Sequence, residues 1–414
     1  MVPMGSAAMD GGDAVLVINC GSSSVKYQLI AVGSEAVVAG GVFERIGESG
    51  SRLRHREADK SERVVELPAA NHREALAHIA ETLRRGLSPL RLAAVGHRVV
   101  HGGEHFQEPA RIDEDVLERI RSLSPLAPLH NPVNVIGIEV ALNLFPDVSQ
   151  VAVFDTAFHQ RMPRYAAQYA IPQDWYRNYG VRRYGFHGTS HEYVAERAAR
   201  YLARPLSELK LITLHLGNGA SAAAIAAGVS IDTSMGLTPL EGLVMGSRSG
   251  DLDPAIIAYM QRVAGLDAAQ SEQLLNHAAG LKGLGGSNDM RQILAAATAG
   301  NEAAELALEV FCYRIKKYIG AYLAVLGGID ALVFTGGIGE NAAPVRSRST
   351  AGLRGLGIAV DSCRNESAEG AVAEIQESHC ETKVLVIRTN EELQIARQVL
   401  SVCRRATVAG CTTQ

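Results

Sequence analysis

Several features that mark particular classes of protein are missing from this 414-residue chain. Its six cysteines contain no CxxC pair, which argues against a zinc site or a disulfide framework and favours reduced thiols. No apolar run reaches the roughly 20 residues that a membrane-spanning helix needs. The formal net charge is only −4, which offers no electrostatic attraction to nucleic acid or to a membrane surface. We therefore expect a cytoplasmic protein with no nucleic-acid or membrane partner.

The rest of the composition suits a globular protein of two domains. The length allows two sizeable cores, and 47% of the residues are hydrophobic. Residues 1–12 lack a basic segment before a long apolar run, so we expect a flexible extension there. Apolar, β-favouring runs alternate with helical patterns, which predicts an α/β fold with largely buried strands. The expected strands lie within residues 92–100, 149–158, 209–219, 331–337 and 383–389, and the expected helices within residues 71–85, 193–203, 301–326 and 391–402.

Two segments share one pattern of apolar strand, polar turn and second apolar strand. The first, VLVINCGSSSVKYQLI, spans residues 15–30, and the second, LITLHLGNGASAAAIAAG, spans residues 211–228. The lysine after the serines does not complete a P-loop, because the GxxxxGK spacing is absent and no helix start follows. Turns of this composition can still bind an anion. Two interpretations stay open: ordinary hairpins that are similar by chance, or equivalent turns of a duplicated domain that face a nucleotide's phosphates.

Polar side chains follow several of the expected strands. Three histidines lie in GHRVVHGGEHF (96–106), but the β-branched pair and the diglycine argue against the helix that their spacing would need to hold a metal. Arg98 in this segment is either a bidentate ligand for carboxylate or phosphate, or an ordinary surface arginine. Asp155 follows an apolar strand, a position from which a carboxylate can reach into a cleft.

Two later turns hold further candidates. The segment RYGFHGTSHEYV (183–194) predicts a helix that begins near Ser190, with Thr189 and Glu192 as its capping box. His187 would lie just outside this helix, where it can face an anion. The segment MGLTPLEGLVMGSRSGDLDP (235–254) places Arg248 among glycines and serines, with few side chains to hold it in a core.

Long motifs spread over the chain after residue 13 resemble those of the acetate kinase (acetokinase) family, within the superfamily of acetate and sugar kinases, heat-shock chaperone ATPases and actin. The motifs are NCGSSSVKYQL, GHRVVHGGE, PLHNP, VFDTAFH, YGFHGTSH, HLGNGAS, MGLTPLEGLVMGSRSGDLDP and FTGGIGEN. The resemblance implies a two-domain, actin-like α/β fold with a duplicated βββαβαβα core and a nucleotide in the interdomain cleft. It assigns residues 13–155 plus 391–414 to an N-terminal domain and residues 156–390 to a C-terminal domain.

The resemblance also implies an activity. Family members transfer the γ-phosphoryl group of ATP to acetate in a reversible, direct in-line reaction that yields ADP and acetyl phosphate, a precursor of acetyl-CoA. The reaction depends on Mg²⁺, for which Mn²⁺ can substitute. The resemblance further implies a homodimer.

Each position that matches a family motif takes the corresponding role. The implied Mg²⁺ ligands, direct or through water, are Asn19 and Glu391. The acceptor carboxylate is implied to bind Arg98, beside a small apolar pocket of Val100, Leu129, Phe186 and Pro239. The reacting centre is implied to be lined by His130, Asp155, His187 and Arg248. The nucleotide is implied to contact Ser22, Ser24 and Lys26 in the first turn, His215, Leu216, Gly217, Asn218 and Gly219 in the second, then Asp289, Met290 and Arg291, and finally Gly337, Ile338, Gly339, Glu340 and Asn341.

The chemistry of the acceptor limits what these residues can do. A carboxylate with a pKa of about 4 is already ionised at neutral pH, so a general base has no proton to remove. The obstacle is repulsion between two anions, which Arg248 and His187 are suited to reduce. Asp155 is then expected to orient metal-bound water or Arg98. Glu391 has a second interpretation, because Thr389 and Glu392 fit a capping box whether or not a metal binds.

Three other functions stay open. Propionate kinases share the motifs, and one methylene in a small pocket changes binding by only about 1–3 kcal/mol. A chaperone-like or actin-like ATPase would need an additional peptide-binding or assembly segment and would not explain Arg98 beside an apolar pocket. A sugar kinase would need a base, which Asp155 could supply, but an apolar pocket does not suit a sugar ring.

Overall fold

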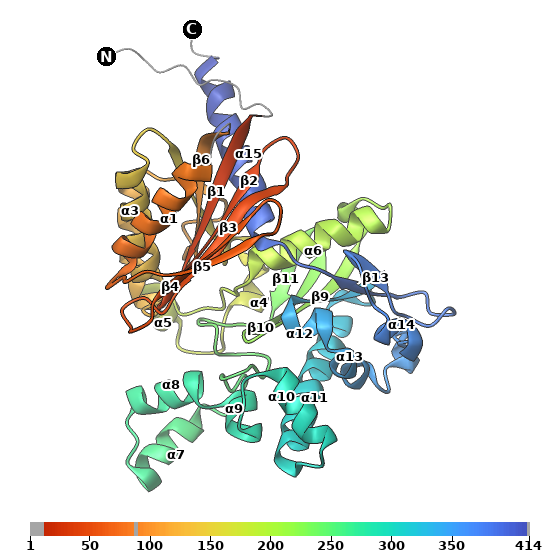
Figure 1. Cartoon of the computed structure of the whole chain (residues 1–414). Helices are drawn as coiled ribbons and strands as arrows, with labels where there is room; N and C mark the ends of the chain where they lie inside the picture. Colours follow the sequence, from red (N-terminus) through yellow and green to blue (C-terminus); the bar gives the residue numbers. More distant parts are fainter. Residues whose placement is uncertain (1–11, 87–89, 412–414) are drawn as a thin grey trace. The chain divides into compact units, whose positions relative to one another are not determined.

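The computed structural model describes residues 12–86 and 90–411, and the chain divides into two compact units (Figure 1). The first unit contains the chain up to Ala157 and the segment from Asn390 onwards, and the second contains Phe158–Thr389. Most of the expected N-terminal extension, residues 1–11, lies outside the described residues. No helix in the described ranges combines the length and the apolarity that crossing a bilayer requires.

The first unit is built on one sheet with strand order β5-β4-β3-β2-β1-β6-β8-β7. Strands β1 to β5 form an antiparallel meander, and β6 and β8 extend it parallel to β1. The strands are β1 (Asp13–Cys20), β2 (Ser24–Ala31), β3 (Val37–Glu44), β4 (Arg52–Glu57), β5 (Glu62–Glu66), β6 (Arg91–Val99), β7 (Ala110–Arg111) and β8 (Ser149–Phe154). The helices are α1 (His72–Gly86), α2 (Glu114–Ser122), α3 (Asn131–Leu144) and α15 (Glu391–Cys411).

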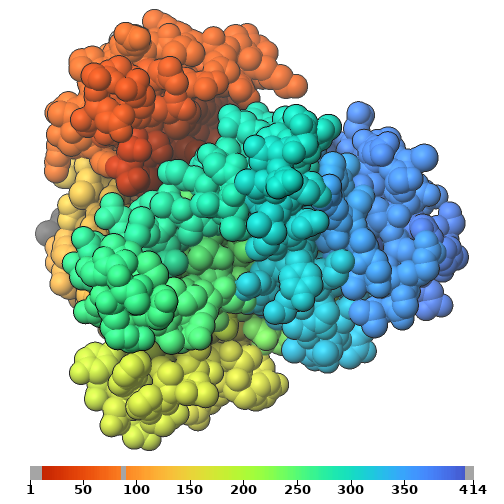
Figure 2. Space-filling view, turned by 90° about the horizontal axis from the view of Figure 1, so that it is seen from below, coloured from red at the N-terminus to blue at the C-terminus, as the bar shows by residue number. Residues whose placement is uncertain are grey.

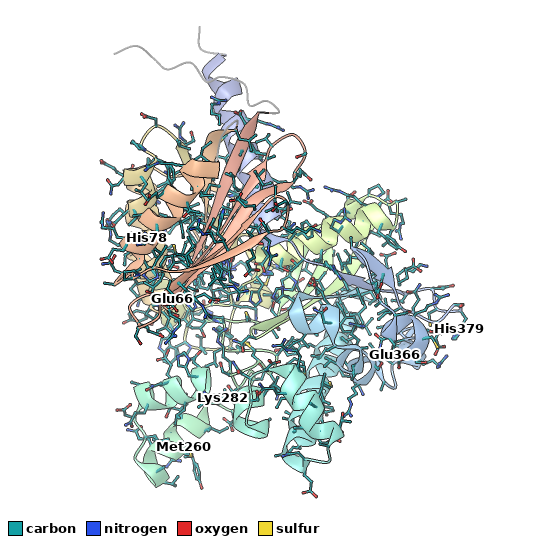
Figure 3. The ribbon with its side chains drawn as sticks, in the orientation of Figure 1. Glu66, His78, Met260, Lys282, Glu366 and His379 are labelled. Atoms are coloured by element: carbon teal, nitrogen blue, oxygen red, sulfur yellow. The ribbon has the colours of Figure 1, made fainter. Side chains whose placement is uncertain are left out.

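Helices cover both faces of this sheet. On one face, Val95 of β6 belongs to a core that includes Leu76 and Ile79 of α1 and Val140 of α3. The next residue, Gly96, faces α15, because side chains alternate along a strand. His78 of α1, which is labelled in Figure 3, stacks on Phe43 of β3 with ring centroids 6.0 Å apart.

The second unit has a sheet with strand order β11-β10-β9-β12-β14-β13. Its strands are β9 (Lys210–Leu216), β10 (Ala220–Ala226), β11 (Val229–Thr233), β12 (Ala331–Thr335), β13 (Val372–Glu374) and β14 (Lys383–Ile387). Its helices are α4 (Arg164–Ala167), α5 (Gln173–Tyr179), α6 (Gly188–Tyr201), α7 (Ala255–Ala264), α8 (Ala268–His277), α9 (Gly280–Gly285), α10 (Met290–Thr298), α11 (Glu302–Leu326), α12 (Gly336–Asn341), α13 (Ala343–Thr350) and α14 (Ser362–Glu366). Residues of α7 to α10, coloured green to teal, lie at the surface in Figure 2.

The two sheets repeat one topology. In each, three antiparallel strands are followed by two strands parallel to the first, so β3-β2-β1-β6-β8 corresponds to β11-β10-β9-β12-β14. This match confirms the internal duplication that the two similar hairpin segments predict. The predicted actin-like α/β fold class is confirmed, and each predicted strand and helix range contains an element of the predicted type.

Both hairpins are present, and neither forms a P-loop. In the first, Asn19 pairs with Lys26, and the turn closes with a Gly21 N–H to Ser24 carbonyl bond of 2.8 Å. In the second, Leu216 pairs with Ala220, and the Gly217 N–H donates to the Gly219 carbonyl at 3.0 Å.

Both predicted capping boxes are wrong. Helix α6 begins at Gly188, so Thr189 lies inside its first turn, and the N-cap His187 makes no capping bond through its side chain. At α15 the cap is one residue later than expected, because Asn390 Oδ1 accepts from the Leu393 N–H at 3.0 Å. The Thr389 hydroxyl instead bonds Ser190 Oγ at 2.9 Å.

The contact between β6 and α15 yields a stability prediction. A Cβ on Gly96 would lie 2.6 Å from Val399 Cγ2 and 3.0 Å from Ile395 Cγ2, so Gly96→Ala should overpack this contact and cost about 1–3 kcal/mol. Gly96→Ala combined with Val399→Ala should cost less than the sum of the single changes, because the second change makes room for the first. Calorimetry measures the free energy of unfolding of the unmodified protein, the two single variants and the double variant.

Gly320 provides the control. Nothing lies within 4 Å of a Cβ at this position of α11, so Gly320→Ala should be neutral or stabilise by up to about 1 kcal/mol. Strictly additive effects of the Gly96 and Val399 changes would contradict the packing.

Candidate functional site

A bidentate ion pair joins the ends of two parallel strands in the first unit. Arg98 on β6 donates from Nε and Nη2 to the two carboxylate oxygens of Asp155, at 2.9 and 2.6 Å. The Asp155 carboxylate is 1% exposed and the Arg98 side chain 22%. Within the described first unit, Arg98 Nη1 has no hydrogen-bond partner. The guanidinium is thus fixed along one edge and open to an anion at Nη1.

Neighbouring carboxylates stabilise the charged form of Arg98. Burial alone would lower the pKa of Arg98, but the charge and hydrogen bonds of Asp155 outweigh this and raise the pKa above its ordinary value. Glu391 and Glu392 act in the same direction. Because both oxygens of Asp155 are engaged with the guanidinium, this carboxylate is poorly placed to accept a substrate proton.

The predicted acceptor-pocket residues are divided between the units. Val100, directly after β6, is buried, and Leu129, which precedes α3, is 54% exposed. Phe186 and Pro239 belong to the second unit. His130 precedes α3 without capping it through its side chain.

Asn19 and Glu391 fit the chemistry of a magnesium site. Within the described first unit, neither side chain makes a hydrogen bond or an ion pair, although both are partly buried. Burial raises the pKa of the Glu391 carboxyl, and the charge of Arg98 only partly offsets this effect. A bound cation would stabilise the ionised form of this carboxyl. No group of three or more metal-binding side chains occurs in the residues described. A sparse site suits Mg²⁺, which keeps several waters and phosphate oxygens as ligands.

In the second unit, a histidine and an arginine meet at the turn of the second hairpin. A Cβ on Gly219 would lie 3.3 Å from His187 Nε2 and 3.8 Å from Arg248 Nη1. His187 adopts a left-handed conformation with φ of 57°, and its ring stacks on that of His215 at 4.3 Å. This places two nitrogen donors beside a backbone turn that can approach an anion closely.

Arg248 lacks an anionic partner. Its Nη1 donates to the Pro239 carbonyl at 3.2 Å, and within the described second unit it forms no ion pair. Burial without such a partner lowers the pKa of Arg248 below its ordinary value. An anionic substrate would therefore supply the charge that this site lacks.

Sequence reasoning missed the residues that orient the histidines. Ser221 Oγ lies 2.9 Å from His187 Nδ1 and 2.8 Å from His191 Nε2, and Ser190 Oγ lies 2.8 Å from His215 Nδ1. Burial lowers the pKa of His191 well below its ordinary value, which keeps this ring neutral. The spacing of His187 and His191, four residues apart at a helix start, was the available signal.

The predicted nucleotide contacts lie in four segments, of which the two hairpin turns are described above. Gly337, Ile338, Gly339, Glu340 and Asn341 form most of α12. Glu340 Oε1 accepts from the Gly336 and Thr389 N–H groups at 3.0 and 3.1 Å, which ties α12 to the end of β14. Arg291 is paired with Asp289 at 2.6 Å.

Near the Arg291–Asp289 ion pair, the side chain of Asn218 connects the second turn to the segment before α10. Its Oδ1 accepts from Asn288 Nδ2 at 3.3 Å. The side chain of Met290 is buried, so only its backbone could face a ligand, and the same holds for Leu216.

Comparison with known proteins identifies relatives over nearly the whole length. The sequence profile described as "Acetokinase family" matches residues 14–397. The acetate kinase of Syntrophobacter fumaroxidans is 52% identical over 404 residues, covering 96% of this chain and 98% of that protein. The crystal structure of Porphyromonas gingivalis acetate kinase has a TM-score of 0.89 at 43% identity, and that of a Francisella tularensis propionate kinase 0.90 at 42%. Each covers 94% of this chain and 99% of the solved chain.

The three histidines of residues 96–106 are separated in the structure. His97 is buried with Nε2 2.7 Å from Gln150 Oε1, His101 Nδ1 accepts from the Gly103 N–H at 3.0 Å, and His105 is exposed. The three side chains thus have different surroundings.

Burial of His97 predicts acid sensitivity. Burial lowers the pKa of His97 to about 4, so the unfolded chain binds a proton below about pH 6.5 that the folded chain does not. Relative to pH values above 6.5, the free energy of unfolding therefore falls as the pH approaches 4, and the loss is about 2 kcal/mol at pH 5. Urea unfolding of His97→Gln at pH 7.5 and 5 should show a correspondingly weaker acid dependence. The exposed His105→Gln should behave as the unmodified chain does; equal slopes in all three proteins would refute the prediction.

Proposed function

The chain belongs to the acetokinase family, and from this premise we propose that it catalyses the reversible transfer of the γ-phosphoryl group of ATP to acetate. An acetate oxygen attacks the γ-phosphorus while the bond to the ADP oxygen breaks, which yields acetyl phosphate and ADP. The observation that carries this proposal is the Arg98–Asp155 pair, in which a buried carboxylate fixes a cation two residues before the buried Val100.

Arg98 is proposed to bind the acceptor carboxylate. Acetate is ionised at neutral pH, so the site needs a cation rather than a proton acceptor. Asp155 holds the guanidinium through two hydrogen bonds and is assigned the role of orienting Arg98. Val100, Leu129, Phe186 and Pro239 are proposed to contact the methyl group.

The groups of the second unit are proposed to stabilise the transferred phosphoryl group. Charge spreads over its equatorial oxygens in the transition state, and His187 and Arg248 supply donors for them. The turn of Gly217–Gly219 and the hydroxyl-rich turn of Ser22–Ser24 with Lys26 are assigned to the phosphates. Asp289–Arg291 and Gly337–Asn341 are assigned to the nucleoside, and His130 to the reacting centre. When bound through Asn19 and Glu391, Mg²⁺ (or Mn²⁺) would neutralise phosphate charge.

Propionate is the second candidate acceptor. It is favoured by the propionate kinase whose structure matches this chain with a TM-score of 0.90. A sugar hydroxyl is disfavoured because it would need a base, and the carboxylate of Asp155 is already engaged by Arg98.

We also propose a homodimer located in the cytoplasm. Helix α7, on which Figure 3 labels Met260, is rich in apolar residues, and none of its ten residues is buried. Ile256, Tyr259 and Val263 on this helix are 44%, 56% and 59% exposed. A second copy of the chain is the occupant we assign to this surface.

A hydroxylamine trap for acyl phosphate tests the reaction. With ATP and Mg²⁺, we expect acyl hydroxamate from acetate, and a comparison of rates with formate, propionate and butyrate ranks the acceptors. Glycerol and glucose are the controls and should give no ADP above background. ADP release from glycerol without trapped product would overturn the proposal.

Kinetics of variants separate the roles of the two arginines. Arg98→Ala should raise the KM for acetate as well as lower kcat, because Arg98 binds the acceptor in both ground and transition states. Arg248→Ala should act chiefly on kcat, with a loss of at least about 10²–10³, which is typical for a preorganised charge-stabilising group. Steady-state rates with melting temperatures as a folding check measure both.

Asp155→Asn distinguishes orientation from base catalysis in the same assay. A positioning role predicts a higher KM for acetate and no loss of an acidic limb in the pH profile of kcat. Disappearance of that limb with an unchanged KM would instead support a base and a hydroxyl acceptor.

A further inference from the structure

Two buried asparagines open helix α3, and neither has a role in the chemistry described above. Asn131 and Asn134 are 0% and 3% exposed. A buried carboxamide without partners is costly, so its hydrogen bonds indicate what it holds together.

Asn134 connects the ends of two neighbouring strands. Its Oδ1 accepts from the Val100 N–H at 3.1 Å, just beyond β6, and its Nδ2 donates to the Cys20 carbonyl at 3.0 Å, at the end of β1. The orientation of the amide is set by these partners, because a backbone N–H requires an acceptor and a carbonyl requires a donor. Only a side chain with both can make this bridge.

The bridge lies where the backbone ladder between the strands stops. The last residue pair between β1 and β6 is Ile18 with His97. Beyond it, the Asn134 carboxamide takes the place of a peptide group between Cys20 and Val100. Helix α3 comes close enough because residue 137 is glycine: a Cβ there would lie 2.5 Å from Cys20 Sγ.

We propose that Asn134 is a positioning residue that sets the spacing between the metal and phosphate turn and the acceptor-binding strand of the first unit. Cys20 follows Asn19, a proposed magnesium ligand, and Val100 lies two residues after Arg98. The bridge itself is independent of substrate, but its effect on catalysis rests on the proposed function.

Asn131 is a matched control in the same helix turn. Its Oδ1 accepts from the His101 N–H at 3.1 Å and its Nδ2 donates to the His101 carbonyl at 3.0 Å. It is equally buried and makes the same two kinds of bond to His101, and its Nδ2 also lies 3.5 Å from the Ile120 carbonyl of α2. Of the two asparagines, only Asn134 makes a hydrogen bond to a residue of β1.

The test compares Asn134→Asp with Asn131→Asp in the full-length protein. Each change keeps the acceptor for a backbone N–H and loses one buried donor. Asn134→Asp should raise the Mg²⁺ concentration for half-maximal rate by about tenfold or more, the usual range for residues that support a metal ligand. The KM for acetate should stay within about twofold. Asn131→Asp should raise the KM for acetate and leave the Mg²⁺ dependence within about twofold.

Hydrogen–deuterium exchange without substrate gives a readout separate from activity. Peptides covering residues 16–26 should exchange faster in Asn134→Asp and remain unchanged in Asn131→Asp. Equal effects of both variants on Mg²⁺ dependence and exchange, or no effect of Asn134→Asp on either, would overturn the proposal. Failure of the unmodified protein to form acyl hydroxamate would instead reject the proposed function and leave the exchange result valid.

Discussion

The ion pair between the partly buried Arg98 and the buried Asp155 is the constraint around which the first unit's site is arranged. Removing two charges from water costs several kcal/mol each, and the cost is recovered only when geometry is good and the polar atoms are satisfied. The ends of β6 and β8 meet this condition, because Asp155 N–H also donates to the Val99 carbonyl at 3.0 Å. The sheet thereby fixes the direction in which the remaining guanidinium nitrogen points.

The duplicated topology supports two different turns. In the first unit the turn between β1 and β2 carries hydroxyl groups and is followed by Lys26 on a strand. In the second unit the turn between β9 and β10 is made of Gly217, Asn218 and Gly219, and two stacked imidazoles lie beside it. One backbone arrangement thus presents a flexible cation in one copy and rigid, hydrogen-bonded rings in the other.

The sequence predicted the strands and helices well because apolar periodicity reports directly on burial. It failed at the helix starts, where Thr389 and Asn390 are both competent caps and tertiary bonds to Ser190 and Glu340 decide between them. For the site, motif resemblance supplied candidates such as Arg98 and Arg248. The bridge made by Asn134 could not be predicted, since a polar residue early in a helix is typical of a solvated turn. Its function depends on contacts with residues distant in sequence.

The first unit is formed by two chain segments that are far apart in the sequence, and this affects the order in which its parts become available during synthesis. Its last helix, α15, packs against β6 through Ile395 and Val399, but these residues are made only after the second unit is complete. The second unit is continuous in sequence, from Phe158 to Thr389, so all of its residues are made before those of α15. Until α15 arrives, the face of the first sheet around Gly96 stays exposed as an apolar surface. The N-terminal unit is therefore synthesised first but completed last, and its sheet can associate with other chains until α15 covers it.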